Sequence, residues 1–140
     1  MKTVTATIEI DATPAEVWAV LTDLASYPQW NPLFPEASGD LVAGKRITLK
    51  SRPSSGRPMT IRPTIVTVEP DAELRWTARL PGIIGGEHAF TLTPASGGTR
   101  LQQSETFRGL LVSVARKTMA RAEADFRALN EAIKNRAENR

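Results

Sequence analysis

The hydrophobic pattern of this chain changes its period once, near Leu110, and this change limits the folds that are open to it. Before that point, short segments alternate apolar and polar residues, as half-buried strands do. After it, apolar residues recur every three or four positions from Leu111 to Ile133, which is the spacing of one long amphipathic helix. Such a helix must bury its apolar stripe against the sheet. The sequence therefore predicts an α+β fold.

The start of the chain predicts a strand followed by two short helices. Residues 3–10 alternate as a strand does. Thr13 suits the N-cap of a helix, Pro14 suits its first position, and Glu16 lies near the positive end of its dipole. Three prolines between residues 28 and 35 exclude a long helix there, so we expect only short turns.

The middle of the chain predicts an antiparallel meander, because its alternating segments are joined by short turns. Residues 59–69 read as one long strand whose inward set changes from Met59 and Ile61 to Val66 and Val68, which predicts a bulge beside Pro63. We expect a curved antiparallel sheet of six to seven strands wrapped around the C-terminal helix. A gap between the two surfaces would form an internal cavity.

Composition excludes several classes of site. The 140 residues fit a single domain over 1–140. There is no cysteine, which excludes disulfides, a thiolate nucleophile and cysteine-bound metals. His88 is the only histidine, so a site with several histidine ligands cannot form within one chain. The acidic residues at turns occur singly. We therefore expect no metal and no cofactor.

Charge and hydropathy also bear on partners and location. The net charge is +3, and the cations are spread along the chain instead of clustered, so we expect no nucleic-acid partner. No segment approaches the apolar length of a membrane span, and the N-terminus lacks the apolar core of a signal peptide. A cytoplasmic location is the expectation, and a homodimer stays open.

Strand pairing predicts that the single imidazole lies beside a carboxylate. A four-residue hairpin loop bracketed by Pro94 and Thr99 would set these facing pairs: Leu92 with Leu101, Phe90 with Gln103, and His88 with Glu105. A carboxylate beside an imidazole favours the imidazolium and orients it, so His88 and Glu105 are candidate acid and base groups. The alternative is a buried polar pair that only satisfies itself. Gln103 would bind either a ligand or the protein's own polar groups.

The predicted cavity has an apolar lining and a candidate lid. The inward-facing candidates for ligand contact are Trp76, Phe90, Gln103, Phe107, Met119 and Phe126. Residues 81–86 place glycines on both sides of Ile83 and Ile84, so this loop could close over the cavity with its isoleucines against the ligand. The alternatives are plain core packing and a rigid hairpin loop. Tyr27, beside Pro28, is expected to be structural.

Three segments carry a resemblance to a known family: Thr13–Trp18 after the first strand, Tyr27–Pro32 after the first helix, and Gly98–Leu110 before the last helix. Together with the order of elements, they resemble the START-like, polyketide cyclase/dehydrase (SRPBCC) superfamily. The resemblance covers nearly the whole chain and implies a helix-grip fold. It does not choose among the functions that this fold supports.

We carry three hypotheses from this resemblance. The first is binding or transport of a small hydrophobic ligand of the lipid, polyketide or isoprenoid type in the cavity. The second is a cyclase/dehydratase-type lyase that uses His88 and Glu105 without a metal or nucleotide cofactor. The third is a protein–protein adaptor of the co-chaperone type. The sequence contains no nucleophile constellation and no cofactor loop, which favours binding.

Overall fold

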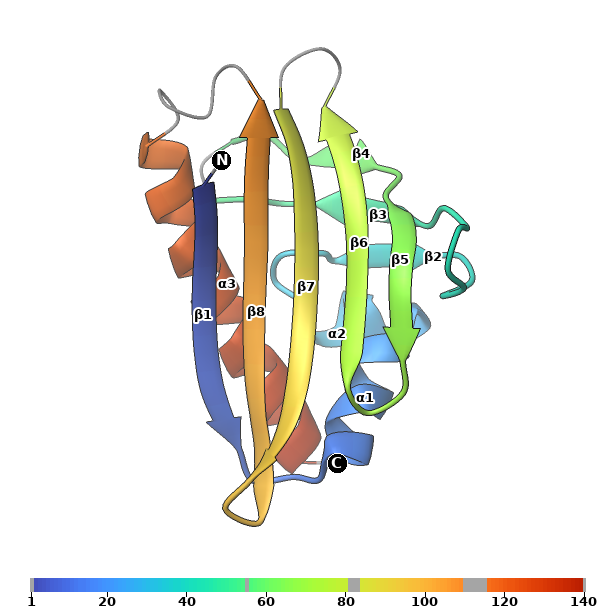
Figure 1. The fold of residues 1–140 in the computed structure, drawn as a ribbon, viewed down its shortest axis with the longest axis vertical. Helices are drawn as coiled ribbons and strands as arrows, with labels where there is room; N and C mark the ends of the chain where they lie inside the picture. The colour runs from blue at the N-terminus through green and yellow to red at the C-terminus, as the bar shows by residue number, and fades with distance from the viewer. Residues whose placement is uncertain (1, 55, 81–83, 110–115, 140) are drawn as a thin grey trace.

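The computed structural model describes residues 2–54, 56–80, 84–109 and 116–139 (Figure 1). Short helices follow the first strand, and a long helix lies near the C-terminus, as the sequence predicts. In chain order the elements are β1 (Lys2–Ile10), α1 (Pro14–Thr22), η1 (Leu24–Ser26), α2 (Tyr27–Trp30), β2 (Glu36–Ser38), β3 (Thr48–Ser51), β4 (Met59–Ile61), β5 (Thr64–Glu69), β6 (Glu73–Leu80), β7 (Ile84–Ala95), β8 (Gly98–Gly109) and α3 (Arg116–Glu138).

The strands form two antiparallel sheets. β5 to β8 make a meander, and β1 pairs with β8, so the larger sheet has the order β1-β8-β7-β6-β5. The smaller sheet has the order β2-β3-β4. Figure 1 shows α3 running behind β1 and β8, with α1, α2 and the smaller sheet behind the other side of the larger sheet. The predicted fold class, a curved antiparallel sheet against a long C-terminal helix, is confirmed.

The sheets differ from the prediction in detail. The described residues hold eight strands in two sheets, where one sheet of six to seven was expected. Residues 59–69 are two strands, β4 in the smaller sheet and β5 in the larger, so the phase change marks the passage between sheets and not a bulge at Pro63. The bulge lies between Ile65 and Thr67. It leaves Ile65 only 1% exposed and Val66 44% exposed, so the prediction that Val66 faces inward was wrong.

The start of α1 is built as predicted. The Glu16 amide donates to the Thr13 hydroxyl at 3.2 Å, and the Thr13 amide donates to the Glu16 carboxylate at 2.9 Å. This capping box satisfies two backbone donors that the helix leaves free. The predicted start of the long helix, residues 110–115, lies outside the described residues.

Candidate functional site

The hairpin of β7 and β8 carries the centre of the candidate site. The strands pair as far as Ala95 and Gly98, so the turn has two residues, Ser96 and Gly97, and not the predicted four. Both have positive φ angles, 47° and 80°, as a tight hairpin turn of this kind requires. The tighter turn keeps the same register. The predicted facing pairs are all present: Leu92 with Leu101, Phe90 with Gln103, and His88 with Glu105.

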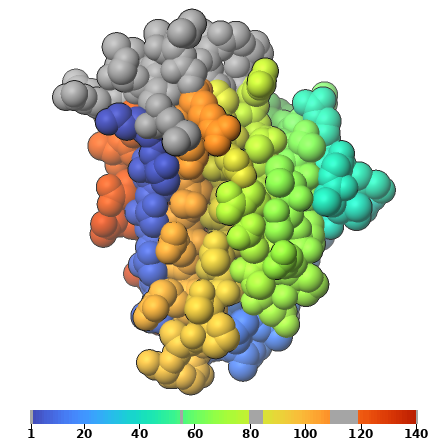
Figure 2. Space-filling model, viewed as in Figure 1, coloured from blue at the N-terminus to red at the C-terminus, as the bar shows by residue number. Residues whose placement is uncertain are grey.

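The inner face of the larger sheet changes in exposure along its length. Near the β7–β8 turn it is closed, and its buried residues include Leu74, Phe90, Leu92, Leu101 and Gln103. Toward Gly109 its inward-facing residues are partly exposed; this region, the open half, comprises Val4, Ala78, Gly86, Glu105 and Phe107. Figure 2 shows the outer face of the sheet as a continuous surface of packed strands. The open half is therefore the part of the sheet that a ligand could reach.

His88 lies at the boundary between the two halves, surrounded by aromatic rings. Its side chain is only 2% exposed. Trp76 stacks on the imidazole with ring centroids 5.3 Å apart. The rings of Phe90 and Phe126 lie 4.8 and 4.9 Å from it, and that of Phe34 lies at 6.0 Å. The imidazole is thus held in a packed aromatic cluster, which fixes the plane of its ring.

A chain of polar side chains runs through this cluster from the sheet to α3. Glu105 Oε1 lies 2.8 Å from His88 Nδ1, and His88 Nε2 lies 2.8 Å from Gln103 Oε1. Gln103 Nε2 donates to the Phe126 carbonyl at 3.1 Å and to Asn130 Oδ1 at 2.9 Å. Among the described side chains, Asn130 Nδ2 is buried without a partner. We call these four side chains, Glu105, His88, Gln103 and Asn130, the polar chain.

Glu105 is the member of the polar chain that reaches the open half. Its side chain is 21% exposed, ten times the fraction of His88. Its outer oxygen Oε2 lies over Gly86, since a Cβ placed on that glycine would be 3.2 Å from Oε2. A glycine at this position leaves room for the carboxylate. The accessible acid–base group is therefore the carboxylate and not the imidazole.

The predicted ligand contacts fall into two groups. Four of them are buried in the cluster around His88: Trp76, Phe90, Gln103 and Phe126. The other two are partly exposed, Phe107 on β8 and Met119 on α3. Their contact with a ligand stays a prediction. For the candidate lid, residues 81–83, including Ile83, lie outside the described residues. Ile84 and the two glycines after it belong to β7, so this part is strand and not loop.

Tyr27 is structural, as expected. It is 1% exposed, and its hydroxyl donates to the Leu21 carbonyl. Burial, with a smaller effect of the nearby Asp23 carboxylate, raises the pKa of Tyr27 far above its usual range. The phenol is therefore held in its protonated form as part of the core.

Sequence reasoning missed Phe34, Gly86 and Asn130. Asn130 follows Phe126 by four positions and precedes Ile133 by three, so a polar residue on the apolar stripe was a signal that could have found it. The glycine pattern predicts a loop over residues 81–86, whereas Gly86 belongs to β7. Phe34 stands between two prolines in a segment without periodicity, and nothing in the sequence places it against His88.

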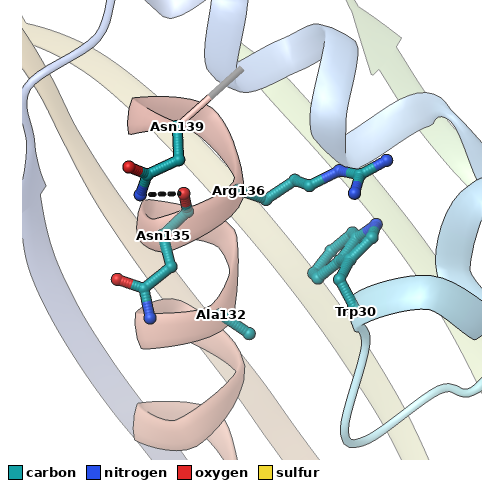
Figure 3. A pocket seen from close by; sticks show the side chains of 5 residues that line it. All are labelled: Trp30, Ala132, Asn135, Arg136 and Asn139. Atoms are coloured by element: carbon teal, nitrogen blue, oxygen red, sulfur yellow. Dashed lines mark hydrogen bonds between the residues drawn. The ribbon is translucent and has the colours of Figure 1, made fainter.

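A hollow lies on the surface between α2 and the end of α3 (Figure 3). Its volume is about 420 Å³, and its lining residues are Trp30, Ala132, Asn135, Arg136 and Asn139. Arg136 extends toward α2 and donates to Gln29 Oε1 at 3.0 Å. The Trp30 ring meets Tyr27 edge-on at 5.2 Å. Trp30 is partly buried and packs its own turn against the core.

Charges on the outer face pair locally. Arg75 donates to Glu73 at 3.1 Å and to Glu87 at 3.0 Å, and these hydrogen bonds raise the pKa of Arg75.

Within the described ranges, no three carboxylate or imidazole side chains gather as metal ligands would. No helix in that part of the chain is both long enough and apolar enough to cross a membrane.

The structure has a long C-terminal helix across a curved antiparallel sheet, short helices after the first strand and a half-open inner face. These features define a START-like helix-grip domain. The model of the family described as polyketide cyclase / dehydrase and lipid transport matches residues 1–138. The chain belongs to this family.

Solved structures share the fold. Protein MLL2253 from Mesorhizobium loti gives a TM-score of 0.79 at 20% identity, covering 98% of this chain and 97% of that one. A START superfamily protein from Mycobacterium smegmatis gives 0.78 at 18% identity, covering 97% of each. The di-domain ARO/CYC StfQ from the steffimycin biosynthetic pathway gives 0.78 at 16% identity, covering 97% of this chain and 50% of that one. No curated protein sequence matches the chain. These likenesses establish the fold alone.

Proposed function

We propose that this chain binds a small hydrophobic molecule, of the lipid, polyketide or isoprenoid type, against the open half of the larger sheet. The observation that carries the proposal is the contrast between the closed and the open halves of one inner face. Ala78 and Gly86 carry at most a methyl group, and Phe107 adds apolar surface beside them. Ligand sites of this kind are mostly apolar with a few placed polar groups, and Glu105 is such a group. Membership of a lipid-transport and cyclase family supports the ligand class.

Filling the open half tests this proposal. Ala78→Phe would place a ring where the ligand is proposed to lie, whereas Thr77→Phe makes the same ring on the outer face of the same strand. We expect the wild type and Thr77→Phe to bind the fluorescent hydrophobe anilinonaphthalene sulfonate equally. Ala78→Phe should bind it about tenfold more weakly, a loss near 1.4 kcal/mol. Equal binding by all three folded proteins would refute the proposal.

A second candidate is cyclase chemistry, which the pairing of Glu105 with His88 favours. In an intramolecular aldol closure, the Glu105 carboxylate takes a proton from a carbon beside a carbonyl. The enolate carbon then bonds to a second carbonyl carbon of the same molecule, and the proton passes to the alkoxide that forms. No atom is gained or lost. Glu105 would touch the substrate, and His88 would position the carboxylate.

A linear diketone able to close a six-membered ring tests this second candidate. Glu105→Gln should abolish the closure because an amide is not a base, whereas Glu87→Gln on the outer face should leave the rate unchanged. Chromatography of the cyclic product measures both. Equal rates in these two variants would exclude Glu105 from the chemistry.

A further inference from the structure

We infer that the ligand of the open half carries a hydroxyl group that donates a hydrogen bond to Glu105 Oε2, and that Gln103 is the positioning residue that fixes the protons of His88 beside that carboxyl group. The inference rests on the proposed binding function, since it names the chemical class of the same ligand. It follows from where the protons of the polar chain must lie.

The orientation of the Gln103 amide is fixed first. Its nitrogen lies 3.1 Å from the Phe126 carbonyl oxygen. A backbone carbonyl only accepts hydrogen bonds, so the atom facing it must be the amide NH₂ group. The same NH₂ group donates to Asn130 Oδ1. The Gln103 oxygen is therefore the atom that faces His88.

The orientation of Gln103 determines the protons on His88. Because Gln103 Oε1 is an acceptor, His88 Nε2, 2.8 Å away, must carry a proton. In a neutral imidazole the other nitrogen, Nδ1, would then be a bare acceptor facing Glu105 Oε1 at 2.8 Å. Two acceptors cannot make this contact, so one further proton lies between them. It resides either on Nδ1, beside a carboxylate, or on Oε1, beside a neutral imidazole.

Both arrangements leave Glu105 Oε2 without a proton. This oxygen is the outward one: Oε1 faces the buried imidazole, while Oε2 lies over Gly86 in the open half. No described residue donates a hydrogen bond to Oε2. A ligand can bind to Oε2 through a hydrogen-bond donor of its own, such as an alcohol or phenol hydroxyl. A ligand oxygen that only accepts hydrogen bonds would be repelled there.

Two probes of nearly the same shape test the inference. β-Naphthol can donate a hydrogen bond, whereas its methyl ether can only accept one. We expect the wild type to bind β-naphthol about tenfold more tightly than the ether, as one hydrogen bond to a partly buried acceptor would give. Fluorescence titration measures both. Equal affinities would overturn the inference and leave the binding proposal standing, whereas failure to bind either probe would overturn both.

Variants of Glu105 assign the acceptor. Glu105→Leu removes it and should abolish the preference for β-naphthol. Glu105→Gln should keep the preference, because its NH₂ group satisfies Nδ1 and its carbonyl oxygen takes the outward position. Glu87→Leu, on the outer face, is the matched control and should behave as the wild type. A preference that survives in Glu105→Leu, or is lost in Glu105→Gln, would contradict the inference.

The role of Gln103 has its own readout in the free protein. Nitrogen NMR of the single histidine should show a proton on Nε2 in the wild type. In Gln103→Leu, Nε2 loses its acceptor, so the imidazole should take the opposite tautomer, with its proton on Nδ1 toward Glu105. A role in packing alone would not move this proton, and an unchanged protonation pattern would refute the assignment of Gln103.

Discussion

Replacing Gln103 by leucine should destabilise the fold by an amount that the polar chain allows us to estimate. The change removes three hydrogen bonds, one with His88, one with the Phe126 carbonyl and one with Asn130. At a net value of about 1 kcal/mol each, their loss costs about 3 kcal/mol. The more apolar leucine returns about 1 kcal/mol because Gln103 is fully buried. We expect Gln103→Leu to lower the free energy of unfolding by roughly 2 kcal/mol, which corresponds to a fall of about 8 °C in Tm for a domain of this size.

The neighbouring Gln102 provides the control. It is exposed on the opposite face of β8, so Gln102→Leu makes the same chemical change outside the polar chain. Its Tm should stay within about 2 °C of the wild type, as exposed substitutions usually do. Thermal and denaturant unfolding followed by circular dichroism compare the three proteins. If Gln103→Leu unfolds at the same temperature as Gln102→Leu, the polar chain does not contribute to stability and the estimate is wrong.

Two further predictions test the frame around the site. A Cβ on Gly98 would lie 2.3 Å from the Ile10 carbonyl oxygen, so Gly98→Ala should lower the free energy of unfolding by about 2 kcal/mol or more. Gly56→Ala, where nothing lies within 4 Å of the added Cβ, should be nearly neutral. Equal midpoints of denaturant unfolding in the two variants would contradict this. Burial raises the pKa of Tyr27 in the folded protein. The stability that Tyr27 contributes should therefore be fully present below its pKa in the unfolded chain, about 10, and should be lost as the pH rises above that value, because only the unfolded chain ionises there. Tyrosinate absorbance should then appear together with loss of circular dichroism, and its appearance in a folded protein would disprove the assignment.

The sequence predicts the facing pairs of β7 and β8 well, because a period of two fixes which residues share a face and a tight turn fixes their register. It misreads residues 59–69, because a segment that passes from one sheet to another has the same phase change as a bulge. Phe34 could not be placed, since its contact with His88 depends on how a proline-rich loop folds back. The split of the inner face into two halves was also beyond the sequence, because alternation gives direction but not exposure.

The position of the polar chain explains why the buried and the accessible parts of this site are linked. A wall of apolar side chains would be cheaper to bury than an imidazole beside a carboxylate. The polar chain also has a geometric effect that apolar side chains lack, because Gln103 on β8 donates to two groups of α3, the Phe126 carbonyl and the Asn130 side chain. These directional bonds hold α3 in one position against β8. The same bonds fix the protons on His88, and through His88 they hold the Glu105 carboxylate at the edge of the open half. Substitutions at Gln103 should therefore change the stability of the fold and the protons on His88, whereas those at Glu105 should act mainly on ligand preference.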